Sequence, residues 1–180
     1  MANDTTPPRL ADDGERWTFL IDPAWDTARD GTPPADAVVG GWLLDADGGT
    51  GPFHPNPDYR PSHPDSPTDP VDATLRLVNR GEADADALLA TMVTAVLGVA
   101  MDEQGNPLVA AAPDGVPSVL VTTAPGHRSR VRAAAGWQEV RAEELAEVLP
   151  DNGVDLLVNP GAPASMRIVA ASLKQAVAAR

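Results

Sequence analysis

The densest group of polar side chains lies in a proline-rich stretch, residues 51–70, and consists of His54, Asp58, His63 and Asp65. Histidine and carboxylate groups bind divalent metals, so these residues are a candidate metal site. Such sites need ligands held on ordered elements with supporting hydrogen bonds, whereas the seven prolines in these twenty residues exclude a helix or a central strand. Solvated loop side chains are the simpler interpretation, and we expect no bound metal or other cofactor.

A serine nucleophile would need a serine on a sharp strand-to-helix turn together with a histidine partner. Ser165 and Ser172 lack the Gly-x-Ser-x-Gly setting, and His127 is the only histidine outside the proline-rich stretch. The glycine pairs at 40–41 and 48–49 lack the lysine and the spacing of a phosphate-binding loop. The absence of a catalytic constellation favours a protein without enzymatic activity.

The segment Asn159-Pro160-Gly161 follows a short apolar run, residues 154–158, and predicts a strand that ends in a rigid turn. Proline pushes the backbone of Asn159 away from the α region, and Gly161 can adopt a positive φ. The turn has two interpretations. It is either a structural turn whose asparagine bonds local backbone, which we favour, or the lip of a partner-binding groove in which Arg167 supplies a charged donor.

Two aromatic residues complete the candidate partner-binding set. Trp25 follows Asp22-Pro23 in a loop, so we expect it to be partly exposed. Tyr59 lies in the proline-rich stretch, which we expect to form an extended arm with its aromatic side chains docked on the body. The other three tryptophans are predicted to be core residues, because the chain has few other aromatic residues to fill an interior.

The positions of apolar residues predict the elements that hold these side chains. Strands are expected at residues 17–21, 38–44, 99–101, 108–111, 117–123, 137–140, 154–158 and 166–169, with a turn at 47–49 and a hairpin joining 99–101 to 108–111. Helices are expected from Pro70, behind the N-cap Asp69, to Gly81; from Asp84 or Asp86 to Gly98; and at 127–135, 142–149 and 170–179.

Mixed runs of this kind predict an α+β fold, with a mostly antiparallel mixed sheet and flanking helices. Residues 1–15 are polar and are expected to form a disordered tail. Residues 16–180 are expected to form a single domain, in which 16–83 supplies the first strands, the arm and a helix, and 84–180 supplies the core.

The net charge of −13 argues against binding to nucleic acid, and it suits a protein partner with a basic face. No apolar run reaches the length of a membrane-spanning helix, and the N-terminal residues lack the apolar region of a signal peptide. The expected location is therefore the cytoplasm, without membrane insertion. The chain has no cysteine and so no disulfide or thiolate site.

Two resemblances follow from particular segments. Residues 84–175, with the helix ADALLATMVTAVLGVAMD, the strand VPSVLVTTA and the GVD-apolar-NPG turn, resemble the N-terminal domain of SseB-like proteins, a family named for enhanced serine sensitivity. The strand SVLVTTA lacks the phenylalanine usual in that family. From about residue 16 onward, RWTFLIDPAW, VVGGWLLD and the NPGAPASMR ending are similar to actinobacterial type VII secretion system-associated proteins.

The resemblance implies a cytosolic role associated with a secretion system that exports small helical WxG-type proteins. It implies no catalytic residues. Our first hypothesis is a non-enzymatic adaptor or chaperone-like protein that binds a secretion component or substrate. The alternative is an enzyme or ligand-binding protein that acts on a small molecule linked to serine sensitivity. A third possibility is a homodimer that uses the strands at 17–44. A concave surface that is apolar and groove-like would favour the first hypothesis.

Overall fold

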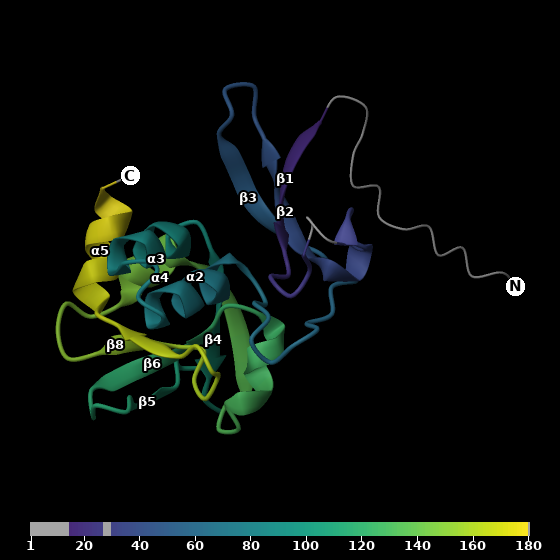
Figure 1. The fold of residues 1–180 in the computed structure, drawn as a ribbon. Coiled ribbons are helices and arrows are strands. Elements are labelled where there is room, and N and C mark those ends of the chain that lie inside the picture. Colours follow the sequence, from purple (N-terminus) through teal and green to yellow (C-terminus); the bar gives the residue numbers. More distant parts are fainter. Residues whose placement is uncertain (1–14, 27–29, 180) are drawn as a thin grey trace, which may run out of the picture.

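The computed structural model describes residues 15–26 and 30–179, drawn as a ribbon in Figure 1. It contains two β-sheets and a layer of helices, so the predicted α+β class is confirmed. The predicted N-terminal tail, residues 1–15, lies outside the described residues except for Glu15.

The first part of the chain forms a three-stranded antiparallel sheet, called here the small sheet. Its strands pair in the order β1-β2-β3 and are β1 (Arg16–Ile21), β2 (Val38–Leu44) and β3 (Thr50–Pro55). The predicted turn joins β2 to β3. In this turn Gly48 has a φ of +86°, and Asp45 Oδ1 accepts hydrogen bonds from the backbone N of Asp47 and Gly49.

The glycine pair of β2 permits an unusually close approach of the neighbouring strands. A Cβ atom on Gly40 would overlap the backbone oxygen of His54 and the ring of Phe53. A Cβ atom on Gly41 would lie 2.8 Å from the ring of Phe19, a distance that real Cβ atoms essentially never show. The two glycines therefore allow the backbones of neighbouring strands to lie close together in the small sheet.

The strand β3 corrects the expectation that residues 51–70 form an arm throughout, because the first of them belong to the small sheet. Pro52 and Pro55 are tolerated there since β3 is an edge strand, and an edge strand needs hydrogen bonds along one side only. Downstream of β3 the chain returns onto the small sheet. Asn56 Nδ2 donates to the backbone oxygens of Ala35 and Val38, at 2.6 and 2.8 Å.

Asp22, directly after β1, anchors the returning chain. Its side chain is buried and accepts hydrogen bonds from Ser66 Oγ (2.9 Å), Ser62 Oγ (3.0 Å) and the backbone N of Ala24 (3.0 Å). Burial alone would raise the pKa of Asp22, but these hydrogen bonds outweigh it and hold the pKa below its ordinary value. The ionised carboxylate therefore fastens the second half of the proline-rich stretch to the small sheet.

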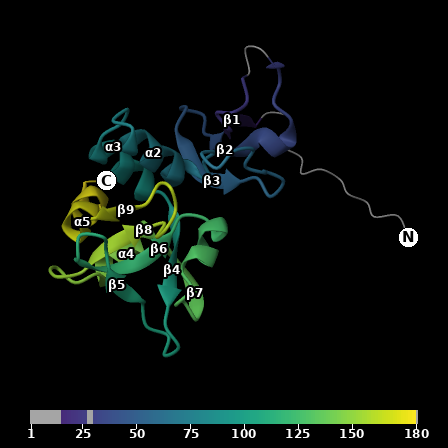
Figure 2. The same ribbon diagram turned by 60° about the horizontal axis from the view of Figure 1, so that its bottom comes forward.

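The larger sheet is mixed and carries the core. Its strands run in the order β7-β4-β6-β8-β9, with β5 paired to β6, and Figure 2 turns this sheet into view. All pairs are antiparallel except β6 with β8, which confirms the predicted character of the sheet. The strands are β4 (Val96–Met101), β5 (Val109–Ala111), β6 (Pro117–Thr122), β7 (Gly136–Arg141), β8 (Asp155–Val158) and β9 (Met166–Ile168).

In the described part of the chain, four α-helices lie over one face of this sheet (Figure 1). Asp69 and Asp84 cap the first two as predicted, accepting hydrogen bonds from the backbone N of Asp72 (3.0 Å) and Ala87 (2.8 Å). Among the described residues, none of the helices combines the length and apolar character needed to cross a membrane. The helices are α2 (Pro70–Asn79), α3 (Ala85–Met92), α4 (Ala142–Val148) and α5 (Ala170–Ala178), and the 3-10 helices are η1 (Ala35–Ala37) and η2 (Pro125–Arg130).

Strand alternation divides the buried residues into two clusters. In β6, Val119 and Val121 face the helices and join a large cluster with Leu75 of α2 and Leu173 of α5. Leu120 faces the opposite side and packs in a smaller cluster with Ala100, Val131 and Leu157. The helix-covered face is therefore the main core.

Three local expectations were wrong. Gly98 does not end a helix, because α3 ends at Met92 and Gly98 lies inside β4, where a Cβ atom would come within 2.9 Å of Thr122 Oγ1. The expected helix at 127–135 is the 3-10 helix η2. The strands at 99–101 and 108–111 do not form a hairpin ladder, since β4 and β5 each pair with β6 and share only the single bridge Met101–Pro107.

Candidate functional site

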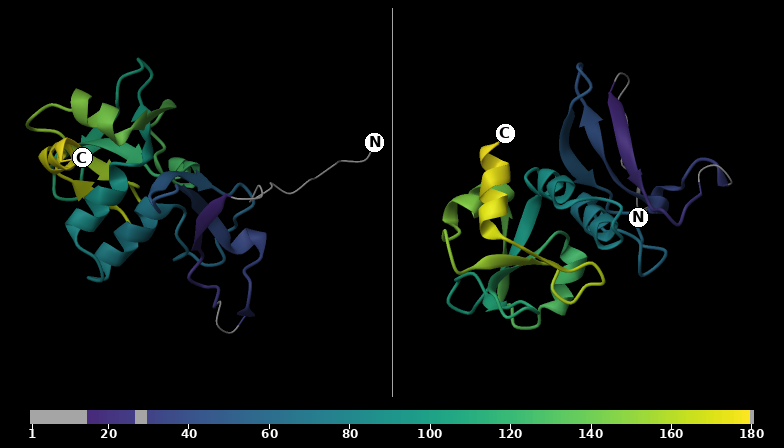
Figure 3. Two further views of the ribbon diagram at one scale, coloured as in Figure 1. Left: turned by 90° about the horizontal axis from the view of Figure 1, so that it is seen from above. Right: turned by 60° about the vertical axis from the view of Figure 1, so that its left-hand side comes forward.

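A cleft of about 600 Å³ separates the small sheet from the helical layer. Both views in Figure 3 show the small sheet standing beside the helices rather than on the larger sheet. Trp42 and Phe53, whose ring centroids are 4.9 Å apart, line one wall of the cleft, and Val71 and Thr91 are part of the other. Its volume and mostly apolar lining are typical of binding sites.

Asp69 supplies the polar floor of this cleft. It is 7% exposed, and its Oδ2 accepts hydrogen bonds from Thr123 Oγ1 (2.6 Å) and Thr68 Oγ1 (2.8 Å), both of which also line the cleft. Its Oδ1 caps helix α2. Burial raises the pKa of Asp69, although the bonds from Thr123, Asp72 and Thr68 oppose the shift.

The floor is tied to the larger sheet through Asn159, at the carboxyl end of β8. Asn159 is fully buried; its Oδ1 accepts from the backbone N of Thr123 (2.9 Å), and its Nδ2 donates to Thr123 Oγ1 (2.9 Å). Because β6 and β8 run parallel, their carboxyl ends meet at one edge. The hydrogen bonds from Asn159 through Thr123 to Asp69 therefore join the sheet edge to the start of α2.

His127 lies behind the floor and contacts it through Thr68. Its Nε2 is 2.9 Å from Thr68 Oγ1 and 3.9 Å from Asp72 Oδ1, and Asp72 in turn accepts from Arg76 Nε at 3.0 Å. In a nucleophilic triad the carboxylate orients the other ring nitrogen of the histidine, whereas here hydroxyl and carboxylate share one nitrogen. The arrangement therefore suits a buried structural network better than catalysis.

We predict that stability depends on the protonation of His127. Burial lowers the pKa of His127 below its ordinary 6.5, although Asp72 and Asp69 oppose the shift. The unfolded chain therefore takes up a proton first as the pH falls. The free energy of unfolding should decrease below about pH 6.5, with a slope of at most about 1.4 kcal/mol per pH unit for one proton. Denaturant melts at a series of pH values measure this slope.

A comparison with His127→Gln isolates this histidine from its surroundings. The raised pKa of Asp69 acts in the opposite sense, because its contribution is complete at low pH and is lost as the pH rises through its folded value. Wild type and His127→Gln share the contribution of Asp69, so it largely cancels when their free energies of unfolding are compared at each pH. Equal slopes for wild type and variant would contradict the prediction. The charged groups that act on His127 are Asp69, Asp72, Arg76 and Arg130.

Residues 159–161 form the predicted structural turn, and the side chain of Asn159 also makes hydrogen bonds outside the turn. Asn159 O accepts from the backbone N of Ala162 at 3.0 Å, and Gly161 has the expected positive φ of +72°. Asn159 itself has a φ of +49°, in the left-handed region that asparagine tolerates better than most residues. Its side chain bonds Thr123, directly after the neighbouring strand β6, rather than local backbone.

The side chain of Arg167 forms ion pairs with two carboxylates of the same chain. Its Nε donates to Asp114 Oδ2 at 2.6 Å, and its Nη1 pairs with Asp155 Oδ2. Asp155 also accepts from the backbone N of Ala170 at 2.9 Å, which fixes the start of α5. The described geometry therefore gives Arg167 a role in joining β9 to the loop before β6, and it does not line the cleft.

Trp25 and Tyr59, the two aromatic candidates, differ in their surroundings. Trp25 is partly exposed, as expected, and its Nε1 donates to the backbone oxygen of Gly31 at 3.3 Å. The hydroxyl of Tyr59 donates to the backbone oxygen of Pro67 (2.7 Å) and lies 3.3 Å from Asp22 Oδ2. Burial and the charge of Asp22 raise the pKa of Tyr59, so the hydroxyl stays a donor at neutral pH.

The candidate metal ligands are not brought together. His54 lies on β3 with its ring 5.3 Å from that of Trp17, and His63 lies 3.6 Å from Asp65 in the loop that follows. Asp58 is exposed and belongs to a turn capped by Asn56. Within residues 15–26 and 30–179, no group of three or more metal-binding side chains is arranged to hold an ion.

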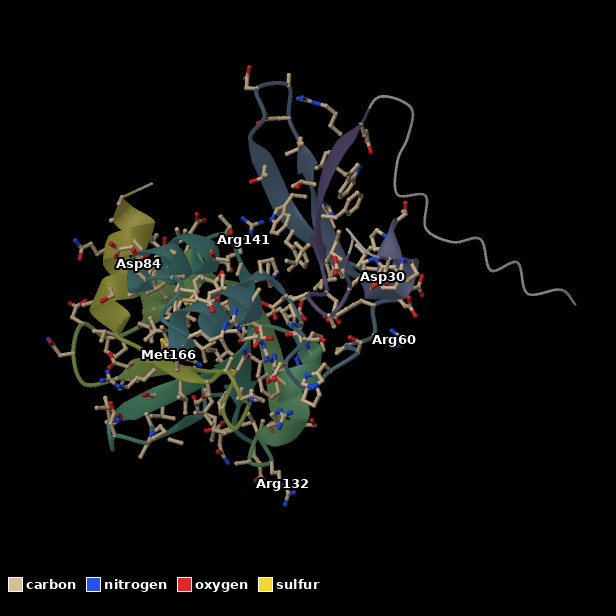
Figure 4. The ribbon with its side chains drawn as sticks, in the orientation of Figure 1. Asp30, Arg60, Asp84, Arg132, Arg141 and Met166 are labelled. Atoms are coloured by element: carbon tan, nitrogen blue, oxygen red, sulfur yellow. The ribbon has the colours of Figure 1, made fainter. Side chains whose placement is uncertain are left out.

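The basic residues around η2 do not form one face. Arg128 pairs with Glu139 (2.8 Å) and lies over the ring of Trp137 (5.4 Å), while Arg130 donates to the backbone oxygen of Gly161 (3.3 Å). Figure 4 places Arg132 at the far end of the molecule from the small sheet. The three arginines therefore lie in different directions and do not share one basic surface.

The residues that sequence reasoning missed are those of the cleft floor: Thr68, Asp72, Thr123 and His127. Asp69 was expected only as a helix cap. The available signal was the run Ser66-Pro67-Thr68-Asp69, in which more hydroxyl and carboxyl groups precede the helix than capping requires. Comparison of the chain with protein families, curated proteins and solved structures gives no match.

Proposed function

We propose that this protein is a non-enzymatic cytosolic adaptor or chaperone-like protein of a type VII secretion system, and that the cleft holds an apolar segment of a secretion component or substrate. The observation that carries the proposal is the cleft itself, which is groove-like and apolar on both walls. The resemblance of the chain to secretion-associated proteins supplies the setting.

The chemistry of the floor supports binding rather than reaction. The hydroxyls of Thr68 and Thr123 are both engaged with Asp69, and His127 lies behind them rather than in the cleft. An enzyme would present a nucleophile, a base and donors for a developing charge toward one open position. The contacts described here hold the floor rigid instead.

Site-specific photocrosslinking tests the proposal. Thr94 lies at the cleft and is exposed, so a photoreactive amino acid placed there should capture the occupant in native cytosol. Val148, 76% exposed on α4 and outside the cleft lining, is the matched control position. We expect position 94, and not position 148, to yield an adduct with a small helical secreted protein or a secretion component.

Two outcomes would overturn the proposal. The first is that no protein adduct forms at position 94 in cytosol from cells that express the secretion system. The second is that both positions yield the same set of proteins, which would indicate nonspecific contact. Light scattering over a range of concentrations separately tests whether two copies of the chain associate.

A further inference from the structure

The cleft has an asymmetric charge pattern. Among the described residues that line it, Asp69 is the only one with a charged side chain, and the other polar side chains are threonines. A carboxylate on an occupant would meet no cation and would face Asp69 directly. A cation would meet the buried carboxyl group of Asp69, whose ionised form the hydrogen bonds from Thr68 and Thr123 favour.

The groups behind the floor add to this negative character. Asp72 is fully buried, and its Oδ1 has no hydrogen-bond partner among the described residues. Its other oxygen pairs with Arg76, which is shared with Asp65 at 3.7 Å. Burial disfavours the protonated form of His127. Asp72 thus shares the guanidinium of Arg76 with Asp65.

The aromatic wall is suited to the same kind of group. Trp42 and Phe53 come from adjacent strands and line the cleft together. The faces of such rings attract cations, with a contribution of about 0.5–2 kcal/mol depending on desolvation. The charge of the whole chain, −13, also favours the approach of a basic partner.

We propose that the protein partner inserts a lysine or arginine side chain into the cleft, with its cationic group near Asp69 and its alkyl stem against Trp42 and Phe53. This inference rests on the proposed function and names the chemistry of the partner's anchor. It specifies a carboxylate–aromatic site for one cation within an otherwise apolar groove.

Three small probes with the same ring test the charge preference directly: 2-phenylethylamine, 2-phenylethanol and 3-phenylpropanoate. Their binding to the full chain can be followed through amide shifts of cleft residues in NMR titrations. We expect the amine to bind at least about tenfold more tightly than the alcohol, and the carboxylate to bind most weakly. Equal affinities for amine and alcohol would overturn the inference.

Variants assign the preference to Asp69. Asp69→Asn retains an acceptor for the helix cap and should abolish the preference for the amine. Should that variant fail to fold, Thr94→Lys places a competing cation at the cleft and should weaken amine binding about tenfold, whereas Thr94→Gln, a neutral side chain of similar reach, should not. Unchanged amine binding in Thr94→Lys would contradict the site.

Competition between the small probes and crosslinking at position 94 distinguishes this inference from the proposed function. If the partner inserts a cation, 2-phenylethylamine should suppress the adduct at position 94 much more strongly than 2-phenylethanol. An adduct insensitive to the amine leaves the adaptor proposal standing and overturns the cationic anchor. Amine binding without any protein adduct shows a site for a free small cation, and it overturns the partner assignment together with the proposed function.

Discussion

Replacing Asn159 by alanine is expected to lower the free energy of unfolding by about 3 kcal/mol. The backbone N of Thr123 would lose its acceptor in a buried position, which costs about 1–3 kcal/mol. Alanine would also have to adopt the left-handed φ of +49°, at a cost of about 1–2 kcal/mol. Denaturant unfolding should show a lower midpoint with an unchanged slope.

Asn159→Gly separates the two contributions. Glycine adopts the positive φ without strain but also lacks the amide, so this variant should be more stable than Asn159→Ala by about 1 kcal/mol and still less stable than wild type. A loss below about 1 kcal/mol in the alanine variant would show that water replaces the amide, and it would refute the structural role given to this turn.

Gly40→Ala is expected to open the small sheet while leaving the larger sheet intact. The added methyl group would overlap the backbone of His54 and the ring of Phe53, so β3 must move away from β2, at a cost of about 1–3 kcal/mol. Phe53 forms part of the cleft wall, so the crosslink at position 94 and the binding of 2-phenylethylamine should both fall about tenfold or more.

Gly51→Ala is the matched control on β3 itself. A Cβ atom there meets the backbone oxygen of Leu43 at 3.7 Å, an ordinary contact, so this variant should bind and unfold like wild type. Hydrogen exchange would localise the change in Gly40→Ala to the small sheet. Faster exchange across β4 and β6 as well would contradict the view that the two sheets respond separately.

The sequence predicted most elements because their signals are local. Asp69 with Pro70, and Asp84, mark helix starts through bonds to backbone three residues away. The run before Asn159 predicted β8 for the same reason, since a short apolar segment closed by a turn needs no distant partner to be recognised. The turn at Gly161 likewise followed from residue type alone.

The remainder depends on partners that are distant in the chain. Thr123 bonds Asp69 and Asn159, which are 54 and 36 residues away, and no local pattern marks such a pairing. Gly98 was assigned to the end of a helix because glycine commonly ends helices, whereas it serves here to admit Thr122 of the neighbouring strand. The cleft was not predictable either, because its walls come from the small sheet and the helical layer, whose packing against each other no local pattern marks.

The parallel pairing of β6 with β8 has a consequence for how the chain reaches its native state. Strands joined by a tight turn, such as β2 and β3, meet after closing a short loop, but β6 and β8 meet only after the chain between them, with η2, β7 and α4, has crossed over. Such high contact order slows folding. The cleft floor, built where these two strands end, is therefore expected to be completed late, after the antiparallel meander of the small sheet has formed.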